Sequence, residues 1–169
     1  MRYNIIGDTD CPVVEISLDR SEVIKIERGS MAYMSNVELE GKLIANKKGI
    51  GGFLGALGRS VVSSESMFIT QATGLENGAI LAVAPSIPGK VQIIHVNQYH
   101  QYCLNNGSFV ACDNTVYYEM VSQKLSRALF GGTGGFFVMN TKGEGDIIIN
   151  GFGDIVELEV TSNRPLTID

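Results

Sequence analysis

Histidine is the first residue type to consider for acid–base or metal chemistry, and this chain has only two, His95 and His100. His95 lies in the β-rich run Val91–Val96, where a lone histidine is most often a hydrogen-bonded surface residue. Metal sites need several His, Cys, Asp or Glu ligands at characteristic spacing, and no such cluster accompanies either histidine. The sequence therefore predicts no metal site and no cofactor.

Serines and carboxylates also lack the arrangements that catalysis needs. Ser30 and Ser108 each follow a glycine, but neither has the Gly-x-Ser-x-Gly pattern of a nucleophile elbow. A serine in this position is better explained as a hydrogen-bond donor to the backbone of a corner. Glu38 and Glu40 are two residues apart, the spacing of one solvated strand face. Without a catalytic set, we predict that the protein is not an enzyme.

A basic, glycine-rich stretch, residues 42–59, is the candidate contact site. It contains four cations and no acid, in a chain whose net charge is −5. Its apolar residues could insert into a membrane surface while the cations meet lipid phosphates, or they could contact a protein partner. A loop or a close-packed junction is the favoured interpretation, because so many glycines make a poor helix. The candidate contact residues are Lys47, Lys48, Phe53, Leu54, Leu57 and Arg59.

Two classes of binding partner are not expected. Gly131–Gly135 has the composition of a phosphate cradle, but it follows a helix candidate and precedes a strand, the reverse of the order in phosphate-binding loops. We interpret it as a helix-ending turn. The acidic net charge makes the molecule repel nucleic acid as a whole, so no nucleic-acid partner is predicted.

The cysteines indicate the compartment. The chain has three, Cys11, Cys103 and Cys112, which cannot all pair within one chain, and free thiols are typical of a reducing environment. The first residues lack the apolar core of a signal peptide, and no apolar run is long enough to span a bilayer as a helix. We therefore expect a cytoplasmic protein.

The elements that position these residues are short strands, arranged in an internal repeat. Phe68–Gly78 returns as Phe137–Gly145, and Arg28–Tyr33 matches Asn106–Ala111, at offsets of about 69 and 78 residues. A further strand-like run, Ile155–Val160, echoes Val91–Val96. Two echoes in the same order predict a duplicated β unit, with residues 1–96 as the first repeat and 97–169 as the second.

Periodicity assigns most elements. Val13–Leu18, Val23–Glu27 and Val37–Leu43 have strand patterns, and Asn77-Gly78 and Asn106-Gly107 are tight-turn signals. One short helix is predicted over Thr115–Phe130, from an approximate helical stripe that Gly131 ends. A weaker helix candidate is Phe53–Val62. The predicted fold class is all-β, with two tandem β-sandwich units and this one helix.

Several short motifs in a fixed order resemble one known family. They are Met31-Ala32-Tyr33-Met34, Gly51–Leu54, Glu65–Thr70, Pro88-Gly89-Lys90, Gly107–Ala111, and Leu129–Gly132 leading into Phe136-Phe137. Together they resemble the mitochondrial-biogenesis family named for altered inheritance of mitochondria protein 24, whose bacterial members are largely uncharacterised.

This resemblance implies a duplicated β-sandwich similar to the trp RNA-binding attenuation protein, often assembled as an oligomer. It also implies an intracellular, non-catalytic role in bacteria and a link to inner-membrane organisation in mitochondria. Family members usually continue past the equivalent of Pro165–Asp169, so the second repeat is expected to lack closing strands.

The leading hypothesis is a non-enzymatic scaffold or assembly protein that forms a homo-oligomer. Two alternatives stay open. The first is a peripheral membrane-binding protein that uses residues 42–59. The second is a small-ligand binder with a pocket between the repeats, because binding sites often form at such junctions.

Overall fold

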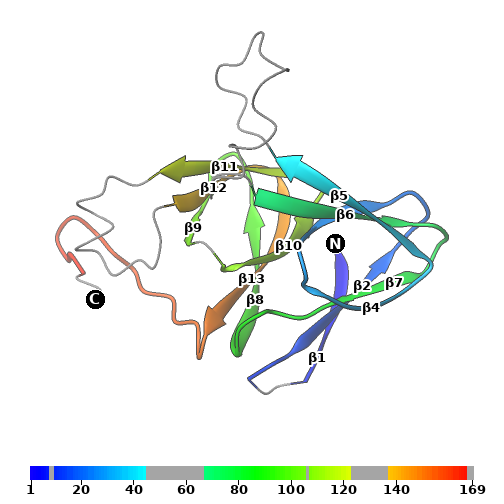
Figure 1. Ribbon diagram of the computed structural model, residues 1–169. Helices are drawn as coiled ribbons and strands as arrows, with labels where there is room; N and C mark the ends of the chain where they lie inside the picture. Colours follow the sequence, from blue (N-terminus) through cyan, green and yellow to red (C-terminus); the bar gives the residue numbers. More distant parts are fainter. Residues whose placement is uncertain (8–9, 45–66, 106, 123–136, 167–169) are drawn as a thin grey trace, which may run out of the picture.

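The computed structural model describes residues 1–7, 10–44, 67–105, 107–122 and 137–166 (Figure 1). All regular elements in these residues are β-strands, so the all-β prediction is confirmed. No helix in the described ranges is long and apolar enough to cross a membrane. The strands are β1 (Arg2–Ile6), β2 (Val13–Leu18), β3 (Val23–Glu27), β4 (Met31–Ser35), β5 (Val37–Ile44), β6 (Met67–Gly74), β7 (Ala79–Val83), β8 (Gly89–Val96), β9 (Cys103–Asn105), β10 (Phe109–Asp113), β11 (Val116–Ser122), β12 (Phe137–Gly143) and β13 (Gly145–Phe152).

These strands form three antiparallel sheets. A four-stranded sheet has the order β1-β2-β7-β4, a six-stranded sheet the order β5-β6-β3-β10-β13-β8, and a three-stranded sheet the order β11-β12-β9. The six-stranded sheet is continuous because β3 pairs with β10. Strands from the first and second halves of the chain therefore meet in one sheet at that point.

Alternating sequence explains the best-defined strand. In β2, Val14, Ile16 and Leu18 are fully buried, whereas the residues between them are only partly buried. Successive side chains in a strand point to opposite faces, so one face joins the core. The predicted strands Val13–Leu18, Val23–Glu27 and Val37–Leu43 are all confirmed.

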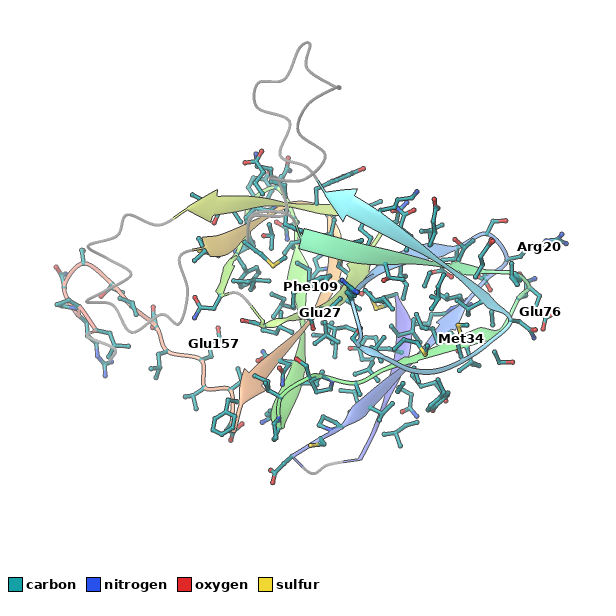
Figure 2. The ribbon with its side chains drawn as sticks, in the orientation of Figure 1. Arg20, Glu27, Met34, Glu76, Phe109 and Glu157 are labelled. Carbon is teal, nitrogen blue, oxygen red and sulfur yellow. The ribbon has the colours of Figure 1, made fainter. Side chains whose placement is uncertain are left out.

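The buried residues form two clusters. The first joins Val14 and Leu81 of the four-stranded sheet to Ile24 and Ile148 of the six-stranded sheet. The second joins Ile147 of the six-stranded sheet to residues of the three-stranded sheet such as Met139. Figure 2 labels Phe109 in the interior, where its ring lies 5.6 Å from that of Tyr118. The six-stranded sheet thus contributes to both clusters.

Two sets of six strands pair in the same way. The pairs β2·β7, β3·β6, β4·β7 and β5·β6 correspond in order to β8·β13, β9·β12, β10·β13 and β11·β12. Registers agree too, since Val37 lies opposite Gly74 as Val116 lies opposite Gly143. The irregularity between Met31 and Tyr33 in β4 matches that between Phe109 and Ala111 in β10.

The predicted helix over Thr115–Phe130 is wrong for its first half. Val116–Ser122 is strand β11, paired residue by residue with β12 from Val116–Gly143 to Ser122–Phe137. Val116 and Tyr118 are buried and Tyr117 is exposed, an alternation with a period of two. β-Branched and aromatic residues favour such a half-buried strand, and pairing with β12 decides the outcome. Residues 123–130, Phe53–Val62 and Gly131–Gly135 lie outside the described residues.

The turns at Gly78 and Gly107 join different sheets. Gly78 and Gly107 have φ angles of +80° and +88°, the left-handed conformation that suits a glycine. The strands on either side of each turn do not pair with each other, since β6 and β10 belong to the six-stranded sheet, β7 to the four-stranded one and β9 to the three-stranded one. These turns are corners, not hairpin loops.

The likeness to the trp RNA-binding attenuation protein and the division at residue 96 stay predictions.

Candidate functional site

The contact residues proposed from the sequence cannot be placed. Lys47, Lys48, Phe53, Leu54, Leu57 and Arg59 all belong to residues 45–66, outside the described part of the chain. Lys42, at the start of the basic stretch, is described, and its Nζ lies 3.3 Å from Glu40 Oε2 on the same exposed strand face. The membrane-contact hypothesis therefore stays a prediction.

His95 forms an exposed pair with an aspartate. Its Nδ1 lies 2.9 Å from Asp146 Oδ1, across the β8·β13 pair. A His–Asp pair supports nucleophilic catalysis only when a hydroxyl or thiol meets the other ring nitrogen, and the described residues show no such contact with His95. Nor do they contain a group of three or more His, Cys, Asp and Glu residues that could hold a metal ion.

The two serines that follow glycine stabilise corners. Ser30 Oγ donates to the carbonyl of Glu27 at 2.9 Å, and Ser108 Oγ donates to the carbonyl of Asn105 at 2.9 Å. The backbone carbonyl of each serine accepts a further bond of 2.8 Å, from the amides of Ala84 and Asn150 respectively. The prediction that both serines hydrogen-bond the backbone of a corner is confirmed.

The junction between the two strand sets is the β3·β10 pair. Ile26 lies opposite Ala111, Lys25 opposite Cys112, and Ile24 opposite Asp113. Apart from the half-buried Asp113, these residues are buried. A lysine in such a place is costly unless its ammonium group finds hydrogen-bond acceptors.

Lys25 finds those acceptors in the backbone next to β11. Its Nζ donates to the carbonyls of Asn114 and Val116, both at 2.7 Å. The same Nζ lies 4.4 Å from the centre of the Tyr117 ring, within range of a cation–π interaction. Burial lowers the pKa of Lys25, because it disfavours the charged form. The lysine thus ties β3 of the first strand set to the β10–β11 connection of the second.

Cys112, opposite Lys25, is chemically inert at neutral pH. Burial is the main cause that raises the pKa of its thiol to about 12, from an ordinary value of 9.0. Thiol reactivity requires the thiolate, so a redox or nucleophilic role for Cys112 is unfavourable. Cys11 and Cys103 are exposed, and all three cysteines are free.

The Cys112 thiol is expected to make stability fall at alkaline pH. Above pH 9 the unfolded chain loses this proton while the folded chain keeps it, so the free energy of unfolding should drop by about 1.4 kcal/mol per pH unit. Urea unfolding between pH 8 and about 10.5 would measure this slope. Cys112→Ala should flatten the slope, whereas Cys11→Ala at an exposed thiol should leave it unchanged. Equal slopes in both variants would contradict the assignment.

Strand β4 is an open edge that carries exposed apolar side chains. Among the described residues it pairs only with β7. Tyr33 and Met34 are 45% and 44% exposed, whereas Ala111 and Cys112, at the same places in β10, are 0% exposed. Figure 2 labels Met34 on β4, well away from the interior position of Phe109. The difference arises because β10 has β3 as a second neighbour.

Strand β9 also lies at an edge, as do the other end strands of the three sheets. It pairs only with β12 in the described part of the chain. Its pattern is exposed, buried, exposed for Cys103, Leu104 and Asn105, and Tyr102 just before it is also exposed. At the same places, β3 has Lys25 and Ile26, which are buried against β10. An edge strand offers unpaired backbone groups to another strand.

The segment after β13 is apolar and exposed. Figure 1 shows it running away from the sheets in orange and red. Val156, Leu158 and Val160 are 71%, 58% and 58% exposed, with Glu157 and Glu159 between them. The same alternation occurs in β2, where Val14, Ile16 and Leu18 are fully buried. Residues 155–160 thus have the sequence of a core strand without its burial.

A shallow cleft lies between the β1–β2 connection and the start of β8. Its volume is about 580 Å³, and its lining includes Ile5, Pro12 and Val91. An ion pair borders it, with Lys90 Nζ 3.1 Å from Asp154 Oδ1. A hydrogen bond from Lys90 lowers the pKa of Asp154. The cleft is large enough for a small ligand.

Sequence reasoning missed both the buried lysine and the open edges. Lys25 had no local signal, because Val23, Lys25 and Glu27 alternate with Ile24 and Ile26 as the solvated face of a strand would. The edges had no sequence signal of their own, because edge position depends on which strands meet in space.

Comparisons with known proteins give one family. The family model described as Mitochondrial biogenesis AIM24 matches residues 3–169. An uncharacterised protein of Streptococcus pyogenes serotype M6 is 42% identical over 170 residues, which cover 100% of this chain and 67% of that protein. A crystal structure of a Streptococcus pyogenes protein from a structural genomics consortium superposes with a TM-score of 0.67 at 38% identity, over 90% of this chain and 65% of that one. The chain spans about two thirds of the length of each relative.

Proposed function

The chain belongs to the mitochondrial biogenesis AIM24 family, and on that premise we propose that it is a non-enzymatic scaffold that assembles with copies of itself. The contact surfaces of the assembly are the open edges of its sheets. The three free cysteines support a reducing compartment, the cytoplasm, as its location.

The matching strand pairs carry this proposal. The strand sets β2–β7 and β8–β13 have matching strand pairs, as two copies of one unit would have. Inside the chain, the units join because β3 of the first pairs with β10 of the second. The equivalents of these strands, β9 and β4, have the same shape but no such neighbour among the described residues. Because the two sets join through β3 and β10, the equivalent edges β9 and β4 are left available for pairing with another strand.

The exposed apolar residues support an assembled state. Tyr33 and Met34 on β4 are exposed, although Ala111 and Cys112 at the same places in β10 are buried. Val156, Leu158 and Val160 after β13 are exposed as well. Burying apolar surface is the main favourable term in protein association. A second copy of this chain would supply the complementary edge, because one chain carries both members of the edge pair.

The non-enzymatic part of the proposal rests on what the polar groups do. Ser30 and Ser108 stabilise corners, and Lys25 is held by two backbone carbonyls. The Cys112 thiol is buried with a raised pKa. The serines and the lysine thus have structural partners, and the thiol is held in its unreactive form by burial.

Native mass spectrometry of the purified full chain would test the proposal. We expect multiples of 18.2 kDa that persist at high ionic strength during preparation, because sheet edges and apolar contacts are not screened by salt as surface ion pairs are. A monomer at all concentrations would contradict the scaffold. Multiples that dissociate in high salt would also contradict it, since they would indicate a contact made by surface charges.

The cleft supports a second candidate function, the binding of a small ligand. It lies between the β1–β2 connection and the start of β8, so a ligand there would contact the N-terminal part of the chain and the second strand set together. The expected result is a reproducible extra mass on the chain, lost in a Lys90→Gln variant that removes the cation at its border.

The membrane alternative through residues 42–59 would be tested by flotation with anionic liposomes of the wild type and a Lys47→Glu/Lys48→Glu variant.

A further inference from the structure

The corner between β6 and β7 contains a dipeptide that can react with itself, Asn77-Gly78. An asparagine followed by glycine is prone to deamidation, because a glycine without a side chain lets its backbone nitrogen approach the side-chain carbonyl carbon of the asparagine. Both residues are exposed, so water reaches them. Sequence and exposure alone would therefore predict that Asn77 converts to an acidic residue.

The reaction consumes water and releases ammonia. The amide nitrogen of Gly78 gives up its proton to solvent and attacks Cγ of Asn77. A new C–N bond forms, and the side-chain nitrogen of Asn77 leaves as ammonia, which gives a cyclic succinimide. Water then opens the ring at either carbonyl and leaves aspartate or isoaspartate. The first requirement is thus that the Gly78 amide is free to lose its hydrogen.

In the fold, the hydrogen of the Gly78 amide is engaged. Gly78 N donates to the carbonyl of Leu18 at 3.0 Å, next to the place where Leu18 lies opposite Ala79 in the β2·β7 pair. A backbone carbonyl accepts a hydrogen bond without removing the proton. The nitrogen that would attack Asn77 is therefore kept in its unreactive form while this bond persists.

The side chain of Asn77 is held as well. Its Oδ1 accepts a bond of 2.9 Å from the backbone amide of Arg20, between β2 and β3. A donor on Oδ1 also polarises the side-chain carbonyl, as an oxyanion hole does, but polarisation has no effect while the Gly78 amide keeps its proton. Figure 2 labels Arg20 and Glu76, the neighbours of these two turns, at the same end of the molecule.

We propose that Asn77 is a deamidation site that the folded protein keeps closed, and that it converts only in chains whose β6–β7 corner has opened. Opening requires the bonds to Leu18 and Arg20 to break together, which is a local event and not unfolding of the whole chain. Isoaspartate adds a methylene to the main chain, so the corner cannot close again in its original register. The modification would mark such chains irreversibly, and it does not depend on the proposed scaffold.

Peptide mass spectrometry of the full chain would test the site. The protein would be incubated at mildly alkaline pH, either folded or in urea, and digested at intervals. We expect Asn77 to convert at least about tenfold more slowly in the folded protein than in urea, because reaction requires the corner to open. Equal rates in the two states would overturn the proposal.

Arg20→Pro would remove one of the two bonds. The β2–β3 connection has the features of a type II turn, since Glu22 N donates to the carbonyl of Asp19 at 3.0 Å and Ser21 has a φ of +66°. Arg20 is the second residue of this turn, where proline is favoured, and proline has no N–H to donate. Arg20→Ala is the matched control, because it removes the same side chain but keeps the N–H.

Asn150-Gly151 supplies an internal reference in the same digests, since Asn150 is buried in β13 and reports general unfolding. We expect Asn77 to convert about fivefold faster relative to Asn150 in folded Arg20→Pro than in wild type, the effect of one hydrogen bond on opening. Arg20→Ala should match wild type. An unchanged or lower ratio in Arg20→Pro, or an equal rise in both variants, would overturn the proposal.

Hydrogen exchange gives a measurement that needs no variant. In the wild-type protein the Gly78 amide should exchange at least about tenfold more slowly than in urea, because the same opening limits exchange and deamidation. Exchange of Gly78 at the unprotected rate would show that the corner is open in the folded protein, and would contradict the proposal even if Arg20→Pro failed to fold.

Discussion

Replacing Lys25 with alanine is expected to lower the free energy of unfolding by about 3 kcal/mol. The substitution removes the donor that satisfies the carbonyls of Asn114 and Val116. Each carbonyl left without a partner in a buried place costs about 1–3 kcal/mol. The side-chain methylenes that cover neighbouring apolar surface are lost as well. Urea unfolding at neutral pH would measure the change.

Two further variants separate the causes. Lys25→Met keeps most of the side-chain volume but has no donor. If the lost bonds to the carbonyls are the main cause, this variant should be only somewhat less destabilised than Lys25→Ala. Lys142→Ala removes an exposed lysine, whose Nζ lies 2.7 Å from Glu119 Oε1, and should cost less than about 1 kcal/mol, as is usual for surface pairs. If Lys25→Ala cost as little as Lys142→Ala, Lys25 would not hold the junction together.

Replacing Gly89 with alanine is expected to cost about 4 kcal/mol, through overlap and backbone strain together. Gly89 has a φ of +150°, which side chains rarely adopt. A Cβ there would overlap the carbonyl oxygen of Gly151. The backbone amide of Gly89 also donates to the carbonyl of Asp10, so a shift to relieve the overlap would break this bond between the β1–β2 connection and β8.

Gly78→Ala is the matched control for Gly89→Ala. Gly78 has a φ of +80°, but a Cβ there would meet no atom within 4 Å. It should therefore cost only the strain of the left-handed conformation, about 1–2 kcal/mol. Thermal or urea unfolding of both variants would measure the difference. Similar losses would show that φ alone, and not the close approach of β8 and β13, explains the need for glycine at residue 89.

Local sequence was reliable where one strand face faces the core. The alternation of Val14, Ile16 and Leu18 predicted β2 correctly, because a period of two leaves only one face to bury. The pattern over Val116–Ser122 was less decisive, and a helix was predicted there. The partner strand β12, a contact distant in sequence, determined the strand.

For the candidate site, the sequence predicted the roles of single residues better than it predicted which residues lie beside them in space. Ser30 and Ser108 were correctly interpreted as corner residues, since a hydroxyl beside a turn glycine bonds the nearby backbone. Lys25 was overlooked because its acceptors, the carbonyls of Asn114 and Val116, are 89 and 91 residues away in the chain. No local pattern reports a bond at such a separation.

The sequence by itself determined that this protein is built from β-strands, where most of its strands run, and to which family it belongs. Those properties follow from side-chain periodicity, turn residues and short motifs, which are all local. Only the tertiary structure decided that β3 meets β10 and that β4 and β9 lie at sheet edges. Every strand carries the same backbone donors and acceptors, so the choice of neighbour depends on the packing of the whole chain.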